Sequence, residues 1–302
     1  MGIPVLRGSG LEGFYCNVVS EDSLFSSQEE ADTRIILHCL HVKEQNTDVR
    51  TIIVRSPDTD VLVLLVKYWT QIGCSILVDT GTGNKRRLVD IESIVKKQGV
   101  DICSVLPAIH CFTGCDTVSA FVRRGKVGPV RLLEKHEEFV STFVQLGEHP
   151  ECSDQLLTEI EQFVCCMYGK PKYEDVNKLR FDTFCKKSEV KGTCTPNSYN
   201  SIDMSLLPPC KATLNMHTRR ANYQTYVWVH AHEAYPDTPD LQKSGWKLGT
   251  DGIEHVWTKE GFVPIELADI LCSWVTEDVP DDEDDNDPVE TEHMLDEVYD
   301  DQ

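Results

Sequence analysis

Five carboxylates stand at the expected ends of helices and strands, where they could share divalent cations. Asp58 and Asp60 directly follow an apolar run, and ligands of parallel sheets bind beyond the carboxyl ends of the strands. Glu30 and Asp32 open the preceding helix, and Asp116 follows a later one. Oxygen ligands of this kind suit Mg²⁺ or Mn²⁺. Two such ions about 4 Å apart can activate water and stabilise both oxygens of a phosphoryl displacement.

Each of these acids also has a structural interpretation. Glu30 and Asp32 could cap a helix and complement its dipole, and Asp58 could be the N-cap of the helix that follows. Taken singly, the structural interpretation is the better one. The order and spacing of the acids together favour a metal site.

The elements that must position these acids alternate between helix and strand. Ser27 and Glu30 have the spacing of a capping box, which predicts a helix from Ser27 through Leu40. Apolar patterning then predicts strands at 51–55 and 75–79 and helices at 61–68, 90–98 and 102–112. This alternation is typical of βα units, so we expect an α/β fold with a mainly parallel sheet.

The second half of the chain is predicted to be mostly helical. Helices are expected at 130–136, 138–146 and 154–168, with another around 215–232. We predict the following organisation: a lead-in at 1–20, a core at 21–150, a helical extension at 151–185, a linker at 186–209, a small α+β unit at 210–275 and a disordered tail at 276–302.

The charge is concentrated in that tail. The formal net charge is −21, and the stretch 277–302 holds 14 acidic residues and no Lys or Arg, which leaves −7 for the rest. A solubilising role is the simpler interpretation, and mimicry of nucleic acid is the alternative. An acidic chain argues against nucleic-acid binding in general. Basic clusters nevertheless occur at 85–87, 123–126 and 219–220.

Four motifs follow one another along the chain: Glu29-Glu30-Ala31-Asp32, Ser56-Pro57-Asp58-Thr59-Asp60, Gly114-Cys115-Asp116 and Gly125-Lys126-Val127-Gly128-Pro129. This ordered set resembles a known family, the flap-endonuclease/XPG-like branch of the PIN-like nucleases. The resemblance covers about residues 26 to 145. The residues of these motifs are also similar to those of uncharacterised XPG-like proteins of animal genomes, some of them derived from mobile elements.

This resemblance implies a PIN-like fold, a two-metal nuclease site and a helix-hairpin-helix that holds DNA. The implied ligands of two Mg²⁺ (or Mn²⁺) ions, which are also the catalytic residues, are Glu30, Asp32, Asp58, Asp60 and Asp116. The implied DNA-backbone clamp, which in the family often holds a monovalent cation such as K⁺, comprises Arg123, Arg124, Gly125, Lys126, Gly128 and Arg131. The implied substrate is DNA, with RNA as the alternative.

The chain departs from the family at its beginning. Family members carry a further Asp on the first strand and an arch that threads DNA, and no equivalent precedes Ser27. We therefore expect either a structure-selective nuclease or a catalytically impaired remnant of one. The alternative is a non-enzymatic module that binds nucleic acid or protein. We expect no membrane partner and an intracellular, nuclear location, the latter because DNA is the implied substrate.

Competing motifs are weaker. Val78-Asp79-Thr80-Gly81 matches half of an aspartic protease site, but no second copy occurs in the chain. The glycine turn at 81–85 is too short for a phosphate loop. Cys111 and Cys115 lack the second pair that a zinc site needs, so most of the 13 cysteines are expected to be reduced thiols.

Overall fold

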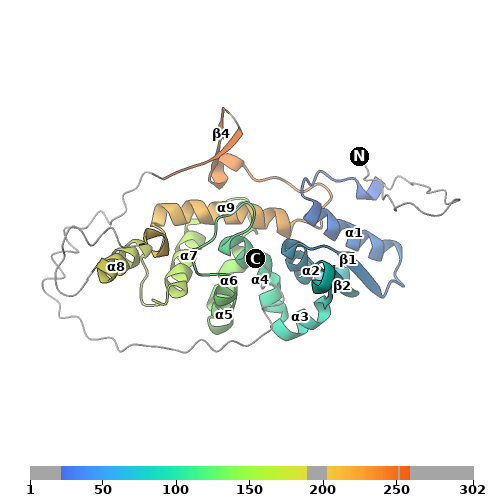
Figure 1. Ribbon diagram of the computed structural model, residues 1–302. Coiled ribbons are helices and arrows are strands. Elements are labelled where there is room, and N and C mark those ends of the chain that lie inside the picture. Colours follow the sequence, from blue (N-terminus) through green and yellow to red (C-terminus); the bar gives the residue numbers. More distant parts are fainter. Residues whose placement is uncertain (1–21, 189–202, 251, 259–302) are drawn as a thin grey trace. The chain divides into compact units, whose positions relative to one another are not determined.

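The computed structural model describes residues 22–188, 203–250 and 252–258 (Figure 1). The predicted lead-in, most of the predicted linker and the acidic tail lie outside the described residues. The chain divides into two compact units, and two of the three boundaries fall inside long helices. Unit 1 comprises 1–107 and 225–238, and unit 2 comprises 108–224 and 239–302. Each unit mixes helices with short strands, so the α/β class is confirmed.

Unit 1 is a small sheet with helices packed against it. Its strands and helices are α1 (Ala31–Gln45), β1 (Thr51–Arg55), α2 (Thr59–Ile72), β2 (Ser75–Thr80), β3 (Arg87–Asp90), α3 (Ile91–Gln98), the first half of α4 (Val100–Thr113) and the end of α9 (Lys211–Val229). The predicted strands and the helices before and after them are confirmed. The predicted capping box is wrong, because α1 begins at Ala31 with Glu30 as its N-cap.

The sheet of unit 1 has the order β1-β2-β3. β1 and β2 run parallel, with Arg55 opposite Asp79, whereas β3 pairs antiparallel to β2. The prediction of a mainly parallel sheet is therefore wrong for the described residues, since one of the two pairings is antiparallel. β3 escaped prediction because Arg87-Leu88-Val89-Asp90 is short and only one of its side chains, Val89, is buried.

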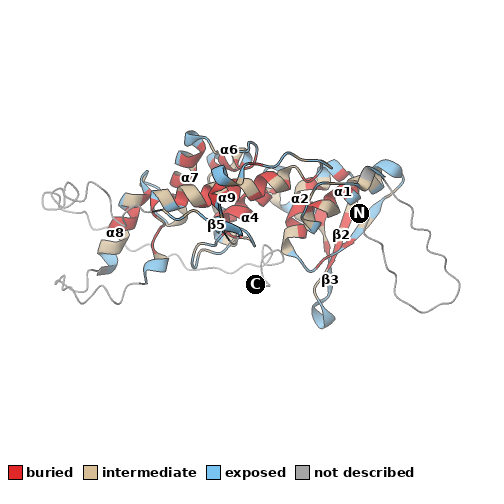
Figure 2. Cartoon of the chain, turned by 90° about the horizontal axis from the view of Figure 1, so that it is seen from above, coloured by how far each residue is buried: buried red, intermediate tan, exposed pale blue. Residues whose placement is uncertain are grey.

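The two faces of this sheet differ in burial. Val54, Ile76 and Val78 are 8 % exposed or less and form the buried face, against which α2 and α3 pack. On the opposite face, Ile53 and Leu88 are 64 % and 61 % exposed. The helix α2 is buried from Val61 through Val66, and Figure 2 draws it in red beside the strands. Burial of this apolar run stabilises unit 1.

Unit 2 is helical around a cluster of aromatic rings. Its remaining elements are α5 (Val127–Lys135), α6 (Glu138–Gln145), α7 (Asp154–Met167), α8 (Val176–Ser188) and the hairpin β4 (Trp246–Gly249) with β5 (Gly252–His255). Phe112, Phe143 and Phe163 are at most 1 % exposed, and their ring centroids are 4.8 to 6.1 Å apart in edge-on contacts. Such contacts add to the stability that burial of the rings provides.

The contact-based division does not follow the predicted domain boundaries. The predicted linker starts inside α8, and the predicted C-terminal unit from residue 210 is shared, since residues 225–238 belong with unit 1. A linear composition profile cannot reveal such a return of the chain. Among the described residues, no helix combines the length and apolar character needed to cross a bilayer.

Candidate functional site

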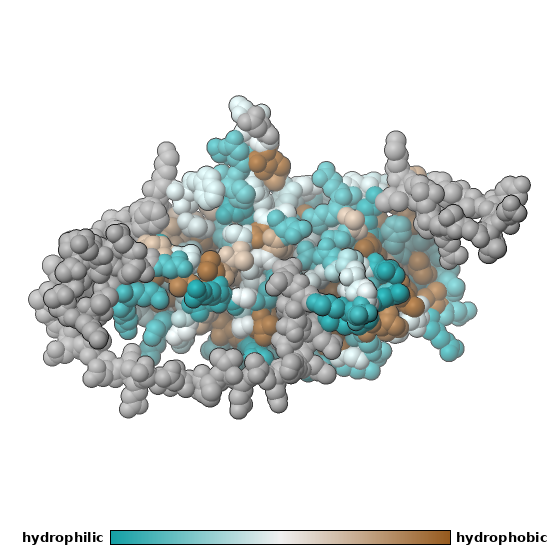
Figure 3. Space-filling model, in the orientation of Figure 1, coloured by the Kyte–Doolittle hydropathy of each residue, from teal (hydrophilic) through white to brown (hydrophobic). Residues whose placement is uncertain are grey.

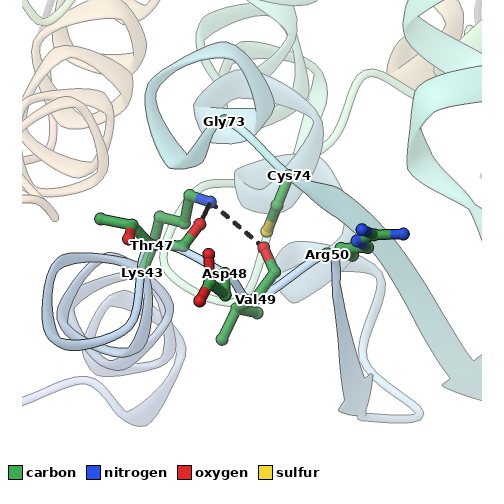
Figure 4. Close-up of a pocket in the computed structure, with 7 residues that line it drawn as sticks. All are labelled: Lys43, Thr47, Asp48, Val49, Arg50, Gly73 and Cys74. Carbon is green, nitrogen blue, oxygen red and sulfur yellow. Dashed lines mark hydrogen bonds between the residues drawn. The ribbon is translucent and has the colours of Figure 1, made fainter.

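The residues that line a pocket at one end of unit 1 show which ends of its helices and strands lie together. The pocket is lined by Lys43 near the end of α1, Arg50 just before β1, and Gly73 and Cys74 between α2 and β2 (Figure 4). The Lys43 ammonium donates to the carbonyls of Thr47 and Val49 at 2.8 and 3.1 Å. The two helices therefore end where the two parallel strands begin.

The opposite end of unit 1 must then hold the helix starts and the strand ends. The helices α1 and α2 pack against each other and have 15 and 14 residues. At about 1.5 Å per residue they are nearly equal in length. Their N-termini consequently lie at the same end, which we call the carboxyl edge because β1 and β2 end there. Four of the predicted ligands belong to this edge: Glu30, Asp32, Asp58 and Asp60.

Asp58 and Asp60 are positioned by the start of α2. Asp58 is exposed and is the N-cap, and its Oδ1 accepts a hydrogen bond from the Asp60 backbone N–H at 2.9 Å. The Asp58 N–H in turn donates to Ser56 Oγ at 3.1 Å. The structural role weighed for Asp58 from the sequence is therefore confirmed. This cap uses one carboxylate oxygen and fixes the side chain at the carboxyl edge.

Glu30 is held by a residue 198 positions away in the sequence. Its Oε2 accepts a hydrogen bond from Trp228 Nε1 at 2.9 Å, and Trp228 is 2 % exposed. Nearby, Gln28 donates to the carbonyls of Ala231 and Glu233, and the Ser27 N–H donates to the carbonyl of Ala234. The entrance to α1 is thus fixed by the segment that follows α9. Local sequence patterns do not reveal this contact, because Trp228 lies in the stretch that composition assigns to a separate C-terminal unit.

Two arginines and a buried aspartate complete the carboxyl edge. Arg86 donates from Nε and Nη2 to the two carboxylate oxygens of Asp79 at 2.7 and 2.6 Å. Arg55 Nη1 lies 3.6 Å from Asp79 Oδ2. The hydrogen bonds from Arg86 hold the pKa of Asp79 below its usual value. β2 continues one residue beyond Asp79, the predicted strand end, to Thr80. Nothing in the local sequence pattern indicates the arginine partners of Asp79.

Asp116, the fifth predicted ligand, belongs to unit 2. It is exposed and lies in the loop after α4, between Cys115 and Val118, which exchange two backbone hydrogen bonds. The neighbouring Cys115 thiol has a pKa lowered to about 6, chiefly by a hydrogen bond with Cys111 and then by hydrogen bonds around Thr117. Four predicted ligands therefore belong to unit 1 and one to unit 2.

The carboxylates do not form a preassembled metal site. Across residues 22–188, 203–250 and 252–258, no three His, Cys, Asp or Glu side chains are arranged to hold one ion. Mg²⁺ needs near-octahedral oxygen coordination, which two or more converging carboxylates and water usually provide. In this arrangement the described residues do not fit a bound pair of ions. One oxygen of Asp58 and one of Glu30 already accept hydrogen bonds within the protein.

The predicted DNA-backbone clamp is partly used for packing within unit 2. The Lys126 ammonium donates to the carbonyls of His110 and Gly114 and so caps the end of α4. Arg124 lies 4.0 Å from the centroid of the Tyr168 ring and donates to the Met167 carbonyl. Arg123 and Arg131 are exposed. These contacts leave Arg123 and Arg131 as the better placed of the predicted basic side chains for a phosphate.

The glycine-rich turn is also displaced from its predicted place. Gly128 and Pro129 lie in the first turn of α5, which begins at Val127 rather than at Val130. A loop at 114–126 separates α4 from α5. Within it Gly125 and Arg123 have φ values of +55° and +59°, the latter rare for a non-glycine residue. A short hairpin turn directly joining two helices is therefore not found at this position.

Comparisons of the chain with family models, with curated proteins and with solved structures gave no match.

Proposed function

We propose that the chain acts on DNA as a metal-dependent phosphodiesterase of the flap-endonuclease/XPG-like type, with a PIN-like unit 1. The observation that carries this proposal is that α1 and α2 begin at the carboxyl edge, where β1 and β2 end. Four predicted ligands belong to this edge: Glu30, Asp32, Asp58 and Asp60. In α/β folds this edge is where ligands bind. Two helix N-termini there favour anions, which lowers the cost of gathering the four acids.

Two of the acids at such a site are held in position by other groups of the chain. Asp58 is held by its cap at the start of α2, and Glu30 is oriented by Trp228. No three ligands converge in the described residues, so hydrolysis at this edge would require DNA or metal to draw these carboxylates together.

A specific observation favours a second function, a DNA-binding module without catalysis. Glu30 and Asp58 each have a structural partner, and Asp116 belongs to another unit. An aspartate that caps a helix and a glutamate that accepts from a tryptophan can remain for stability after catalysis is lost. On this account the arginines of both units would bind phosphates.

Cleavage assays with two matched variants test the enzyme against the module. Asp58→Asn retains an N-cap, because Asn caps helices about as well as Asp, but it removes the carboxylate. Asp90→Asn is the control: Asp90 is the N-cap of α3 and accepts from Glu92 N at 3.1 Å. It is the last residue of β3 and lies opposite Leu77, back along β2 from the carboxyl edge. Both variants should melt like the parent chain.

If the chain is a nuclease, we expect Mg²⁺-dependent cutting of branched or single-stranded DNA. Asp58→Asn should abolish this cutting, and Asp90→Asn should preserve it. Binding of the same DNA without cutting, at any Mg²⁺ or Mn²⁺ concentration tried, would contradict the nuclease and support the module. Cutting that Asp58→Asn leaves intact would rule out the carboxyl edge as its source.

A further inference from the structure

Arg55 and Arg86 share one buried carboxylate and remain accessible to solvent. Asp79 is 9 % exposed in its side chain, whereas the side chains of Arg55 and Arg86 are 69 % and 56 % exposed. Arg86 alone provides both hydrogen bonds that the two carboxylate oxygens of Asp79 receive from the arginines. Arg55 Nη1, at 3.6 Å from Asp79 Oδ2, is close enough for an electrostatic attraction but too far for a hydrogen bond. The three groups therefore carry a net positive charge of one.

The backbone places both arginines beside Asp79. Arg55 is the register partner of Asp79 across the parallel pair, and the Ser56 N–H donates to the Asp79 carbonyl at 3.2 Å. Arg86 lies just after the tight turn that begins at Gly81, which has a φ of +74°. A side chain on Gly81 would collide with the Lys85 carbonyl. Only glycine at position 81 lets the turn close and return the Arg86 guanidinium to Asp79.

These two cations are located where the proposed substrate would lie. Arg55 ends β1 three residues before Asp58, so both belong to the carboxyl edge. Figure 2 draws the turn before β3 as exposed and projecting from the sheet, and Figure 3 shows strongly hydrophilic residues over the region of β2. A planar guanidinium held in a fixed orientation matches two oxygens of a phosphate. An aspartate that orients Arg86 prepares this geometry in advance.

We propose that Arg55 and Arg86, the latter oriented by Asp79, form a binding site for a backbone phosphate of DNA at the carboxyl edge of unit 1. This inference rests on the proposed function and adds the residues of unit 1 that hold its substrate. It also gives a role to the basic cluster at 85–87 and to the Val-Asp-Thr-Gly motif, which the nuclease motifs left unused.

Equilibrium binding of the full chain to fluorescently labelled DNA in EDTA tests this site without catalysis. Arg55→Gln should weaken binding about three- to tenfold at 0.1 M salt and lower the slope of log K against log salt by about 0.7 to 0.9, as for one lost phosphate contact. Arg50→Gln is the matched control, because Arg50 is exposed, adjoins the same strand and lines the pocket at its other end. It should change affinity less than twofold.

Arg86 needs a second design, because Arg86→Gln alone would leave Asp79 buried without its bidentate partner. The double variant Asp79→Asn with Arg86→Gln is therefore compared with Asp79→Asn. A further loss of affinity of about three- to tenfold on adding Arg86→Gln supports the site.

If Arg55→Gln binds DNA like Arg50→Gln, the inference is overturned, even where Mg²⁺-dependent cleavage is found. Conversely, weakened binding by Arg55→Gln in a chain that never cleaves supports the site while the nuclease fails. A parent chain that binds no DNA overturns both.

Discussion

The contact between Glu30 and Trp228 predicts a measurable coupling energy in unit 1. The Trp228 Nε1–H donates to the Glu30 carboxylate at 2.9 Å, and the indole is 2 % exposed. Trp228→Phe keeps an aromatic ring but removes this donor. Glu30→Ala removes the acceptor. If the hydrogen bond orients the start of α1, the effects of the two substitutions on stability will not add.

The magnitude follows from the chemistry of the pair. A hydrogen bond to a charged group contributes about 1.5 to 3 kcal/mol to the free energy of unfolding. Glu30 is partly exposed, so water can replace part of the lost interaction, and we expect a coupling of about 1 to 1.5 kcal/mol. Trp228→Phe by itself should cost about 2 to 3 kcal/mol, because the smaller ring also leaves a void among buried neighbours.

The assay is a double-mutant cycle on the free energy of unfolding. Urea denaturation followed by far-ultraviolet circular dichroism avoids a signal from the substituted tryptophan. The control cycle pairs Trp228→Phe with Glu29→Ala, since Glu29 is the adjacent, exposed acid. That pair should be additive within about 0.3 kcal/mol. A Glu30 cycle as additive as the Glu29 cycle would refute the view that Trp228 positions this carboxylate.

Two further predictions concern unit 2. Burial lowers the pKa of His217 to about 4, and its Nε2 donates to the Phe112 carbonyl at 2.7 Å. Because the unfolded chain binds this proton at a higher pH than the folded chain, stability present above about pH 6.5 should fall by up to ~3 kcal/mol toward pH 4. His217→Gln should make the urea midpoint depend less on pH between 6.5 and 4. A pH dependence as steep as that of the parent chain would show that His217 does not cause the loss of stability. Lys126→Met should lower the thermal stability of unit 2 by about 1 to 3 kcal/mol through loss of the α4 cap, whereas Arg131→Met should leave the melting temperature nearly unchanged. Equal stability of the two variants would show that Lys126 is not a cap.

The local elements of the chain could be predicted because short-range physics defines them. The β-branched run 51–55 and the apolar run that begins at Val61 each carry enough periodicity to identify a strand and a helix. Asp58 directly before α2 is an N-cap in the sequence and in the structure. The short strand β3 could not be predicted in this way, because four residues with one buried side chain show almost no hydrophobic periodicity.

The sequence by itself determined which residues begin α2, which strands form the parallel pair and that several acids stand at element ends. Tertiary structure alone decided the neighbours of those acids. It brought Trp228 to Glu30, paired Arg86 with Asp79, and assigned Asp116 to unit 2. The physical reason is that capping and periodicity act within a few residues. A hydrogen bond between residues 198 positions apart depends instead on how the whole chain returns to its first unit.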